Sequence, residues 1–341
     1  MAITIKDVAR EAGVSITTVS KIINGTPTIS QATTEKVQAI MDRLEYIPNK
    51  RAANFSRAAT KNIVFLATLA KGQVFMNPHM FEMICGIQNE LSVHGYTLTL
   101  VDTSRETNDG ELARKIILEK SADGIIVFGE SINKSTADFI TNKGFPHIVI
   151  GKPEFTHRVC WIDFNNVLSG ETAAQHLIQC GYKRIAFIGG KKDQGISLYR
   201  LQGAQLYLQE HGADIIEKDI YYIDYDVRES YNAALSLLKQ NTRPDAIICE
   251  SSLIAVGVMK ALDENDIVVP TDMGVIMIDD HPYSKAIFPS PTVVNIDIYD
   301  LGVQAAKSLL RKIKDPALQM QIYTTLPELI KRETTRKIES M

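Results

Sequence analysis

A short segment near the N-terminus carries side chains that can read the edges of DNA bases. Ile16 and Thr17 stand at the exposed start of an expected helix, and Lys21 follows about one turn later. Ile16 can make apolar contact with a thymine methyl group, and Thr17 can form hydrogen bonds with a base edge. Lys21 can reach a guanine or a phosphate. On spacing alone, a three-helix head that binds another protein is the alternative.

The rest of the chain lacks the sequence signatures of common catalytic sites. The segment GKKDQGIS has the glycine spacing of a phosphate-binding loop, but Ile196 stands where that loop requires lysine. No G-x-G-x-x-G follows the first expected strand of the body, and no G-x-S-x-G elbow occurs. The seven histidines are scattered without metal-ligand spacing. We therefore expect no enzyme, no metal site and no cofactor.

Three short helices are expected to position the N-terminal side chains. Thr4 can cap a first helix that ends at Gly13, and Ser15 can cap a second that ends at Asn24-Gly25. Ser30 opens a third helix. Its apolar face comprises Val37, Ile40, Met41 and Leu44. A helix, a glycine turn and a second helix are typical of a helix-turn-helix, whose second helix lies in the major groove.

From Ile63 onward, apolar strands alternate with amphipathic helices. The expected strands lie in IVFLATL, YTLTLVD, GIIVFG, HIVIG, RIAFIGG, YYIDY, AIICE and MGVIMIDD. Continuous apolar runs of this kind are typical of parallel strands buried on both faces. Their number fits two doubly wound α/β lobes. A ligand is expected in the cleft between the lobes, where loops at the carboxyl ends of the strands converge.

The bulk composition indicates a globular chain with an uneven charge. The 341 residues suffice for two or three domains, and 45% apolar and 23% charged residues are ordinary for a soluble protein. Residues 1–61 contain nine Lys/Arg and five Asp/Glu, whereas the remainder contains 28 and 35. A basic N-terminal segment can neutralise phosphates, while an acidic body avoids nonspecific contact with nucleic acid.

Membrane and secretion signals are missing from the sequence. No segment approaches the roughly 18 to 20 uninterrupted apolar residues that span a bilayer, and the charged N-terminus does not fit a signal peptide. We expect a cytoplasmic protein without membrane contact. The spacing of the cysteines fits reduced core thiols better than disulfides or a zinc site. They are Cys85, Cys160, Cys180 and Cys249.

The head segment TIKDVAREAGVSITTVSKIING, followed by EKVQAIMDRLEYIPN, closely resembles the DNA-binding head of the lactose/galactose repressor (LacI/GalR) family. The resemblance continues in RLQG at 200–203, IDD at 278–280, PSPTVVNID at 289–297 and LPELIKRETT at 326–335. It implies an all-α helix-turn-helix head over 1–47, a hinge helix and linker over 48–61, and a two-lobed, periplasmic-binding-protein-like α/β body over 62–341. Lobe 1 is expected at about 62–160 and 293–325, and lobe 2 at about 161–292 and 326–341, on the usual size of such domains.

The resemblance assigns roles on DNA to particular residues of the head. It implies that Ile16 and Thr17 mainly set the operator sequence, and it puts Lys21 where the family more often has arginine. Lysine lacks the planar fork that arginine presents to guanine. The implied DNA-contacting set comprises Thr4, Ser15, Ile16, Thr17, Thr18, Ser20, Lys21, Asn24, Ser30, Thr33, Asn49, Ala52 and Phe55. For any single polar side chain of this set, local helix capping is an equal alternative.

The segment PNKRAANFSRAAT resembles the family's hinge, a short helix that forms on DNA and pairs with its dimer mate in the minor groove. Phe55 stands where the family usually places a leucine wedge between the central base pairs. A phenylalanine ring can still unstack a base step. Lys50, Arg51 and Arg57 can neutralise phosphates or be solvated linker charges. A contact between Phe55 and the body is the alternative to the wedge.

The resemblance also implies a site for a small polar effector between the lobes. Arg200 resembles the family arginine that grips effector hydroxyls or carboxylate, and Asp279 resembles the acidic residue that accepts from effector hydroxyls. The expected effector-binding set comprises Phe75, Asn77, Phe128, Trp161, Arg200, Tyr225, Ser251 and Asp279. The alternatives are a surface or salt-bridged Arg200, a loop-capping Asp279 and aromatic side chains that only pack. Ser251-Ser252 and Gly151-Lys152 replace carboxylate-containing pairs that are common in the family.

These features together imply a homodimeric transcription regulator. It would bind a near-palindromic double-stranded DNA operator and repress a carbohydrate uptake or catabolism operon. A sugar or sugar derivative between the lobes would change the spacing of the hinge helices, which couples the two binding sites. One rival is a solute-binding protein that binds no DNA, which the intact head disfavours. The other is an enzyme with a DNA-binding head, which the missing catalytic signatures disfavour.

Overall fold

The head is a three-helix unit in which each helix begins where its capping residue predicts. The computed structural model describes residues 4–23, 29–44, 46, 59–69, 78–106, 110–192, 195–281, 284, 286–319 and 321–336. The head helices are α1 (Ile5–Ala12), α2 (Ile16–Ile23) and α3 (Gln31–Arg43). Gly13 adopts a left-handed backbone with φ 65° and ends α1, as expected. The helices share a small core of Val8, Ala9, Ala12, Val19, Val37, Ile40 and Met41.

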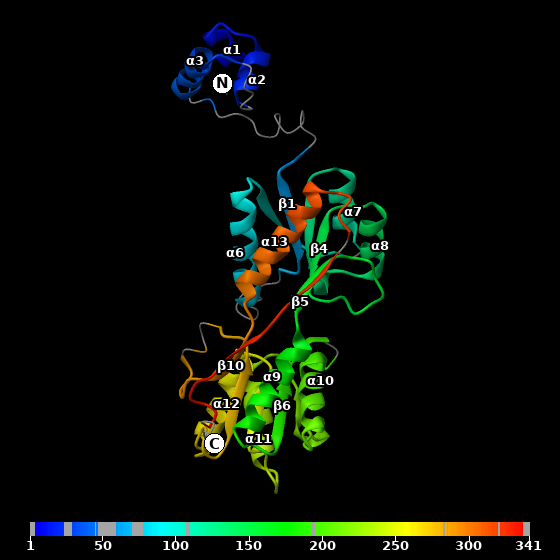
Figure 1. Cartoon of the computed structure of the whole chain (residues 1–341), viewed down its shortest axis with the longest axis vertical. Coiled ribbons are helices and arrows are strands. Elements are labelled where there is room, and N and C mark those ends of the chain that lie inside the picture. Colours follow the sequence, from blue (N-terminus) through cyan, green and yellow to red (C-terminus); the bar gives the residue numbers. More distant parts are fainter. Residues whose placement is uncertain are drawn as a thin grey trace.

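The first lobe of the body is a six-stranded parallel sheet in the order β11-β5-β4-β3-β1-β2, with helices packed against it (Figure 1). Its strands are β1 (Asn62–Ala67), β2 (Thr97–Asp102), β3 (Gly124–Phe128), β4 (His147–Ile150), β5 (Trp161–Phe164) and β11 (Ile322–Thr325). Its helices are α6 (Pro78–Val93), α7 (Glu111–Leu118), α8 (Lys134–Asn142) and α13 (Ile298–Lys314), with the short 3-10 turn η1 (Gly129–Ser131). In β1, Ile63 and Phe65 enter one core and Val64 and Leu66 the other, so the sheet is buried on both faces.

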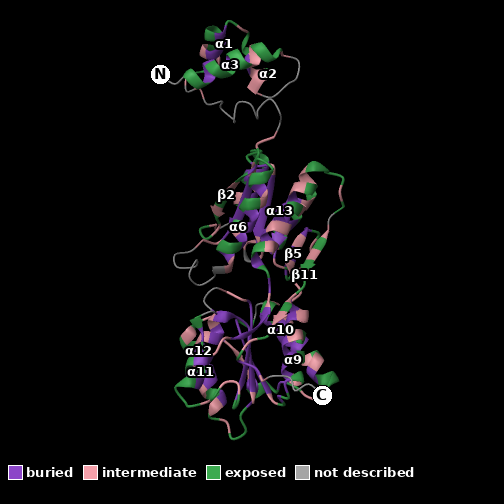
Figure 2. Cartoon of the chain, turned by 60° about the vertical axis from the view of Figure 1, so that its left-hand side comes forward, coloured by how far each residue is buried: buried purple, intermediate pink, exposed green. Residues whose placement is uncertain are grey.

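The second lobe repeats this architecture in the order β12-β10-β9-β8-β6-β7. Its strands are β6 (Ile185–Gly189), β7 (Ile220–Tyr222), β8 (Ala246–Cys249), β9 (Gly274–Ile278), β10 (Thr292–Asn295) and β12 (Glu328–Ile330), of which β12 is antiparallel to β10. Its helices are α9 (Asn166–Gln179), α10 (Gly195–Glu210), α11 (Val227–Leu238) and α12 (Ser252–Asp263), with η2 (Glu217–Asp219). Figure 2 shows the buried residues along the sheet, between the covering helices.

The chain crosses between the lobes from β5 to α9, from β10 to α13 and from β11 to β12. The expected lobe boundaries are wrong by one strand at two of these crossings. Trp161–Phe164 pairs with β4 and β11 in the first lobe, and Thr292–Asn295 pairs with β9 and β12 in the second. These strands have four residues each, and membership of a sheet is decided by backbone pairing that such short patterns do not reveal.

The four cysteines differ in exposure. Cys160, Cys180 and Cys249 are buried, but Cys85 is exposed on α6, so the expectation of core thiols is wrong for Cys85. The apolar period of α6 does not distinguish a thiol at the edge of the buried stripe from one inside it. Burial raises the pKa of the Cys249 thiol, which keeps it protonated and unreactive. None of the helices in the described ranges is long and apolar enough to cross a membrane.

Candidate nucleic-acid interface and ligand cleft

Helix α2 presents the predicted base-reading side chains to solvent. Ile16 is 45% exposed, and Thr17 and Lys21 are also exposed. On the other side of α2, Val19 is fully buried, and Ile22 packs against the head core. An isoleucine exposed at the first turn of a rigid helix has no packing role in the head itself. Its placement is what contact with a thymine methyl group requires.

Several hydroxyls of the predicted DNA-contacting set form local caps. The Ser15 hydroxyl accepts from the backbone N–H of Thr18 at 3.1 Å, and that of Ser30 accepts from the N–H of Thr33 at 3.3 Å. Thr4 donates to Asp7 through its N–H and its hydroxyl, which lowers the pKa of that carboxyl. The capping alternative is therefore present in the structure. Contact with DNA stays a prediction for these residues and for Ser20.

Some predicted residues of both sites lie outside the part of the chain that the structure describes. Asn24 and the hinge residues Asn49, Ala52 and Phe55 lie outside the described residues, and so do the predicted effector residues Phe75 and Asn77.

In the second lobe, the ends of parallel strands converge on the edge that faces the first lobe. Tyr225 follows β7, Glu250 follows β8 and Asp279 follows β9. Contacts between the lobes identify this edge. Nε2 of His79, on α6, lies 3.2 Å from Oδ2 of Asp279, and Nζ of Lys152 donates to the Tyr199 hydroxyl at 3.0 Å. Carboxyl ends of parallel strands facing a second lobe are the expected place for a ligand.

Arg200 lies at the centre of this edge and is held from two sides. It is only 6% exposed. Its Nε donates to Oδ1 of Asn166 at 3.0 Å, and its Nη1 donates to the backbone carbonyl of Glu250 at 2.8 Å. The alternative of a surface arginine is therefore wrong. Neutral acceptors thus bind the guanidinium, and its positive charge also favours the charged form of the Asp163 carboxyl.

Asp279 offers a buried acceptor at the same edge. The residue is 2% exposed, and its Oδ2 accepts from the N–H of Ser252 at 3.4 Å besides facing His79. Its Oδ1 is buried without a hydrogen-bond partner among the described residues. Because the hydrogen bond from the Ser252 N–H is long, the Asp279 carboxylate contributes little to the capping of α12. A buried oxygen without a donor is costly, and a ligand hydroxyl would satisfy it.

Tyr225 belongs to a polar cluster around Glu250 that the sequence did not reveal. Glu250 is fully buried and accepts from the N–H of Gly190 at 2.8 Å and from the hydroxyls of Ser197 and Tyr225. Glu250 is the last letter of the expected strand AIICE. A charged residue placed directly after a buried strand, at the edge where ligands bind, was the available signal.

Asp163 is a second acidic residue that the sequence analysis missed. It lies in β5, where the chain leaves the first lobe for α9. Burial raises the pKa of the Asp163 carboxyl, although the N–H groups of Lys152 and Phe164 donate to it and Arg200 also favours its charged form. Ser251-Ser252 and Gly151-Lys152 replace pairs that usually contain a carboxylate in the family. Glu250 and Asp163 supply carboxyl groups in the same region.

The remaining predicted effector residues have less direct positions. Phe128 is half-buried at the carboxyl end of β3 and packs on the first-lobe core. The Ser251 hydroxyl caps α12 by accepting from the N–H of Ile254 at 3.3 Å. Trp161 is the first residue of β5, pairs with Val149 near the carboxyl end of β4, and packs against the core that contains Val159. A contact between Trp161 and a ligand stays a prediction beside the alternative of packing.

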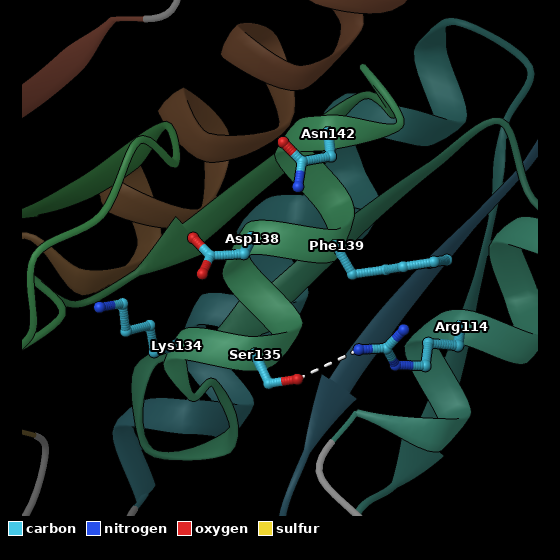
Figure 3. A pocket seen from close by; sticks show the side chains of 6 residues that line it. All are labelled: Arg114, Lys134, Ser135, Asp138, Phe139 and Asn142. Carbon is cyan, nitrogen blue, oxygen red and sulfur yellow. Dashed lines mark hydrogen bonds between the residues drawn. The ribbon is translucent and has the colours of Figure 1, made fainter.

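A surface hollow between α7 and α8 has a different character (Figure 3). Arg114 stacks over the Phe139 ring at 4.4 Å and donates to the Ser135 hydroxyl at 3.1 Å. The hollow is lined by Arg114, Lys134, Ser135, Asp138, Phe139 and Asn142, none of which belongs to the predicted effector set. The Arg114 guanidinium and the Phe139 ring already form a cation–π contact with each other. Within the described residues, no group of three or more His, Cys, Asp or Glu could hold a metal ion.

Comparison with known protein families agrees with both parts of the chain. Residues 4–49 match the model of bacterial regulatory proteins of the lacI family, and residues 174–335 match that of the periplasmic binding protein-like domain. Over 339 residues, the chain is 30% identical to the HTH-type transcriptional repressor PurR of Actinobacillus pleuropneumoniae serotype 3 (strain JL03), an alignment that covers 98% of this chain and 99% of that protein. It is 29% identical over 330 residues to the ribose operon repressor of Escherichia coli (strain K12), with 96% and 98% covered.

Solved structures agree with the fold. The transcriptional regulator CelR in complex with cellobiose matches with a TM-score of 0.72 at 26% identity, over 97% of this chain and 99% of that one. The lac repressor dimer bound to operator and the anti-inducer ONPF matches with a TM-score of 0.84 at 23% identity, over 99% and 100%. The head and the two lobes thus define a DNA-binding transcription regulator with an effector-binding body. The chain belongs to the LacI family of bacterial regulatory proteins.

Proposed function

We propose that this regulator represses an operon for carbohydrate uptake or catabolism, and that a small polyhydroxy ligand binds between its lobes. The observation that carries the proposal is the convergence of Arg200, Tyr225 and Asp279 at the edge of the second lobe. A guanidinium, an aromatic hydroxyl and a carboxylate oxygen that has no partner among the described residues suit a ligand with several hydroxyls. A ribose operon repressor among the relatives and a regulator solved with cellobiose support this ligand class.

The regulator works as a cytoplasmic homodimer and not as an enzyme. Its two heads read the half-sites of a near-palindromic operator, and paired hinges bend the DNA with Phe55 as the wedge. Support for a second copy comes from exposed apolar side chains on α6 and the edge strand β2. Phe81 is 62%, Val93 76% and Leu100 45% exposed. A homodimer would cover this surface.

Ligand binding and operator binding are coupled through the angle between the lobes. The three crossings make the lobes a hinged pair, and a ligand held by both lobes favours one angle. Since the expected hinge over 48–61 directly precedes β1 of the first lobe, that angle sets the spacing of the paired hinges. A coupling free energy of about 1 to 3 kcal/mol would change operator affinity roughly 5- to 150-fold.

The test is a selection of bound duplexes from a random palindromic library with the full chain, followed by a gel shift with and without sugars. We expect one enriched sequence class and a complex that a sugar weakens or strengthens. Phe55→Ala should weaken binding to the enriched operator and leave nonspecific binding nearly intact. The absence of any sequence-selective complex, at every sugar tested, would refute the proposal.

A further inference from the structure

The direction of the hydrogen bonds around Glu250 bears on which ligands can bind between the lobes. Oε2 of Glu250 accepts from the backbone N–H of Gly190 at 2.8 Å and from the Ser197 hydroxyl, and Oε1 accepts from the Tyr225 hydroxyl. Glu250 and Ser197 are fully buried, whereas Tyr225 is half-buried. Tyr225 is therefore the member of the cluster that a ligand can touch.

The hydrogen of the Tyr225 hydroxyl is committed to Glu250. A carboxylate can only accept hydrogen bonds, so the hydroxyls of both Tyr225 and Ser197 donate to it. Burial and the Glu250 charge raise the pKa of Tyr225, so the phenol keeps its hydrogen. A phenol has one hydrogen, and its oxygen then offers a ligand only lone pairs. Towards the cleft, Tyr225 is an acceptor.

Close packing keeps this geometry from rearranging. A Cβ atom built on Gly190 would lie 2.3 Å from Cζ of Tyr225, and one on Gly189 would lie 2.7 Å from Oε2 of Glu250. Both values are below van der Waals contact, so the Gly189-Gly190 pair makes room for the ring and the carboxylate. Tyr225 itself has φ 45°, a left-handed backbone that its surroundings must hold.

Carboxyl groups and cations both lie where the two lobes meet, and the carboxylate beside Tyr225 is that of Glu250. Carboxyl groups are supplied by Glu250, Asp279 and Asp163. The cations are Arg200 and Lys152, whose Nζ donates to Tyr199, and the His79 ring faces Asp279. An anionic group beside Tyr225 would lie close to the negative charge of Glu250. It would receive no hydrogen bond from the phenol, whose hydrogen is donated to Glu250. Repulsion between like charges is strong where water is excluded.

We propose that Glu250 is a positioning residue for ligand specificity, because it fixes Tyr225 as a hydrogen-bond acceptor. The site then selects ligands that present hydroxyl or ammonium donors to Tyr225. It rejects ligands that present phosphate or carboxylate to Tyr225. This inference rests on the proposed function, in which the ligand binds between the lobes. The selected class is a neutral or amine-bearing polyhydroxy compound.

The first test is a thermal-shift panel of matched pairs with the full-length protein. The pairs are D-ribose with ribose 5-phosphate, D-glucose with glucose 6-phosphate and with gluconate, and D-glucosamine with glucosamine 6-phosphate; cellobiose is added as a neutral disaccharide. We expect a rise in Tm only with neutral or amine-bearing members. A rise with a phosphorylated or carboxylated member, or no rise with any neutral or amine-bearing member, would overturn the proposal.

The second test reverses the hydrogen bond. In Glu250→Gln, the amide can donate to Tyr225 and release the phenol hydrogen towards the ligand. We expect calorimetry to show roughly tenfold weaker binding of the best neutral or amine-bearing compound, and a ratio of affinities shifted towards its anionic partner. A merely structural role would leave that ratio unchanged. Tyr225→Phe provides a second variant, in which the acceptor is lost and neutral binding weakens without reversal.

A matched control exists on the protein surface. Tyr231 donates to Oε2 of Glu264 at 2.6 Å in an exposed pair of the same lobe. Glu264→Gln should leave the ligand preference unchanged, and an equal change in both variants would contradict a specific role for Glu250. Different results would overturn this inference and the proposed function. A phosphorylated sugar that releases the operator would overturn this inference alone, whereas loss of sequence-selective DNA binding in the wild type would overturn the regulator.

Discussion

Nε2 of His79 lies 3.2 Å from Oδ2 of Asp279, so a side chain of the first lobe contacts a buried carboxylate of the second at the ligand cleft. The ring of His281 packs edge-on against His79, with centroids 5.6 Å apart. The contact joins the lobes through a carboxylate whose other oxygen has no partner among the described residues. Closure of the lobes and recognition of the ligand therefore depend on the same group.

Removal of this contact should open the lobes. In His79→Ala, the closed arrangement loses the contact of the imidazole with a buried carboxylate, a change of about 1 to 3 kcal/mol. We expect small-angle scattering of the ligand-free variant to show a larger radius of gyration than the wild type. His94→Ala, which alters a half-exposed histidine just after the same helix, serves as the control. Identical scattering from His79→Ala and wild type would contradict a role in closure.

Arg200→Ala should abolish the ligand response and preserve operator binding. The substitution removes the cation of the cleft and leaves Oδ1 of Asn166 and the Glu250 carbonyl without their donor. The head does not depend on either bond. Arg228→Ala, at an exposed position of the same lobe, is the matched control. The measurement is an operator gel shift across a sugar titration, and an unchanged dose-response curve would remove Arg200 from the site.

Ile16 and Lys21 should differ in how they affect DNA binding. Ile16→Ala should cost about 1 to 3 kcal/mol at the one base pair that it contacts and relax the preference there. If Lys21 contacts a phosphate, Lys21→Ala should weaken binding to all sequences and lower the slope against salt by about one. Competition with single-base operator variants at several salt concentrations separates the two. Equal loss on every duplex for Ile16→Ala would contradict a base-reading role.

His176 should make the second lobe sensitive to acid. Burial lowers its pKa from 6.5 to about 4, with a smaller effect of Lys331. Above pH 6.5 the imidazole is neutral in both states and costs nothing. As the pH falls from 6.5 towards 4, the unfolded chain takes up a proton that the folded chain refuses, so the free energy of unfolding falls by up to about 3 kcal/mol.

Urea unfolding at pH 7 and pH 5 checks this dependence. His176→Gln, which can keep a hydrogen bond to the Thr335 hydroxyl, should flatten the loss of stability between the two values. His211→Gln removes an exposed histidine and should leave the loss as in the wild type. The same pH dependence in His176→Gln and wild type would assign the acid sensitivity to other groups.

The sequence predicted the elements whose signals are long or local. The three head helices begin at their predicted caps, and each long apolar run overlaps a strand. The short strands β5 and β10 were assigned to the wrong lobes because sheet membership depends on distant backbone partners. Glu250 was missed for the same reason. Its partners Ser197 and Tyr225 lie 53 and 25 residues away, and only the fold brings their hydroxyls to one carboxylate.

The most direct test of the account is an anisotropy titration of the full chain on the selected operator and on a scrambled duplex, each with and without the neutral sugar that raises Tm most. We predict at least about 10³-fold preference for the operator, and a roughly 5- to 150-fold change in operator affinity with the sugar. Arg200→Ala should keep the preference and lose the change. Equal affinity for both duplexes, or an operator affinity that the bound sugar leaves unchanged, would contradict a ligand-controlled regulator.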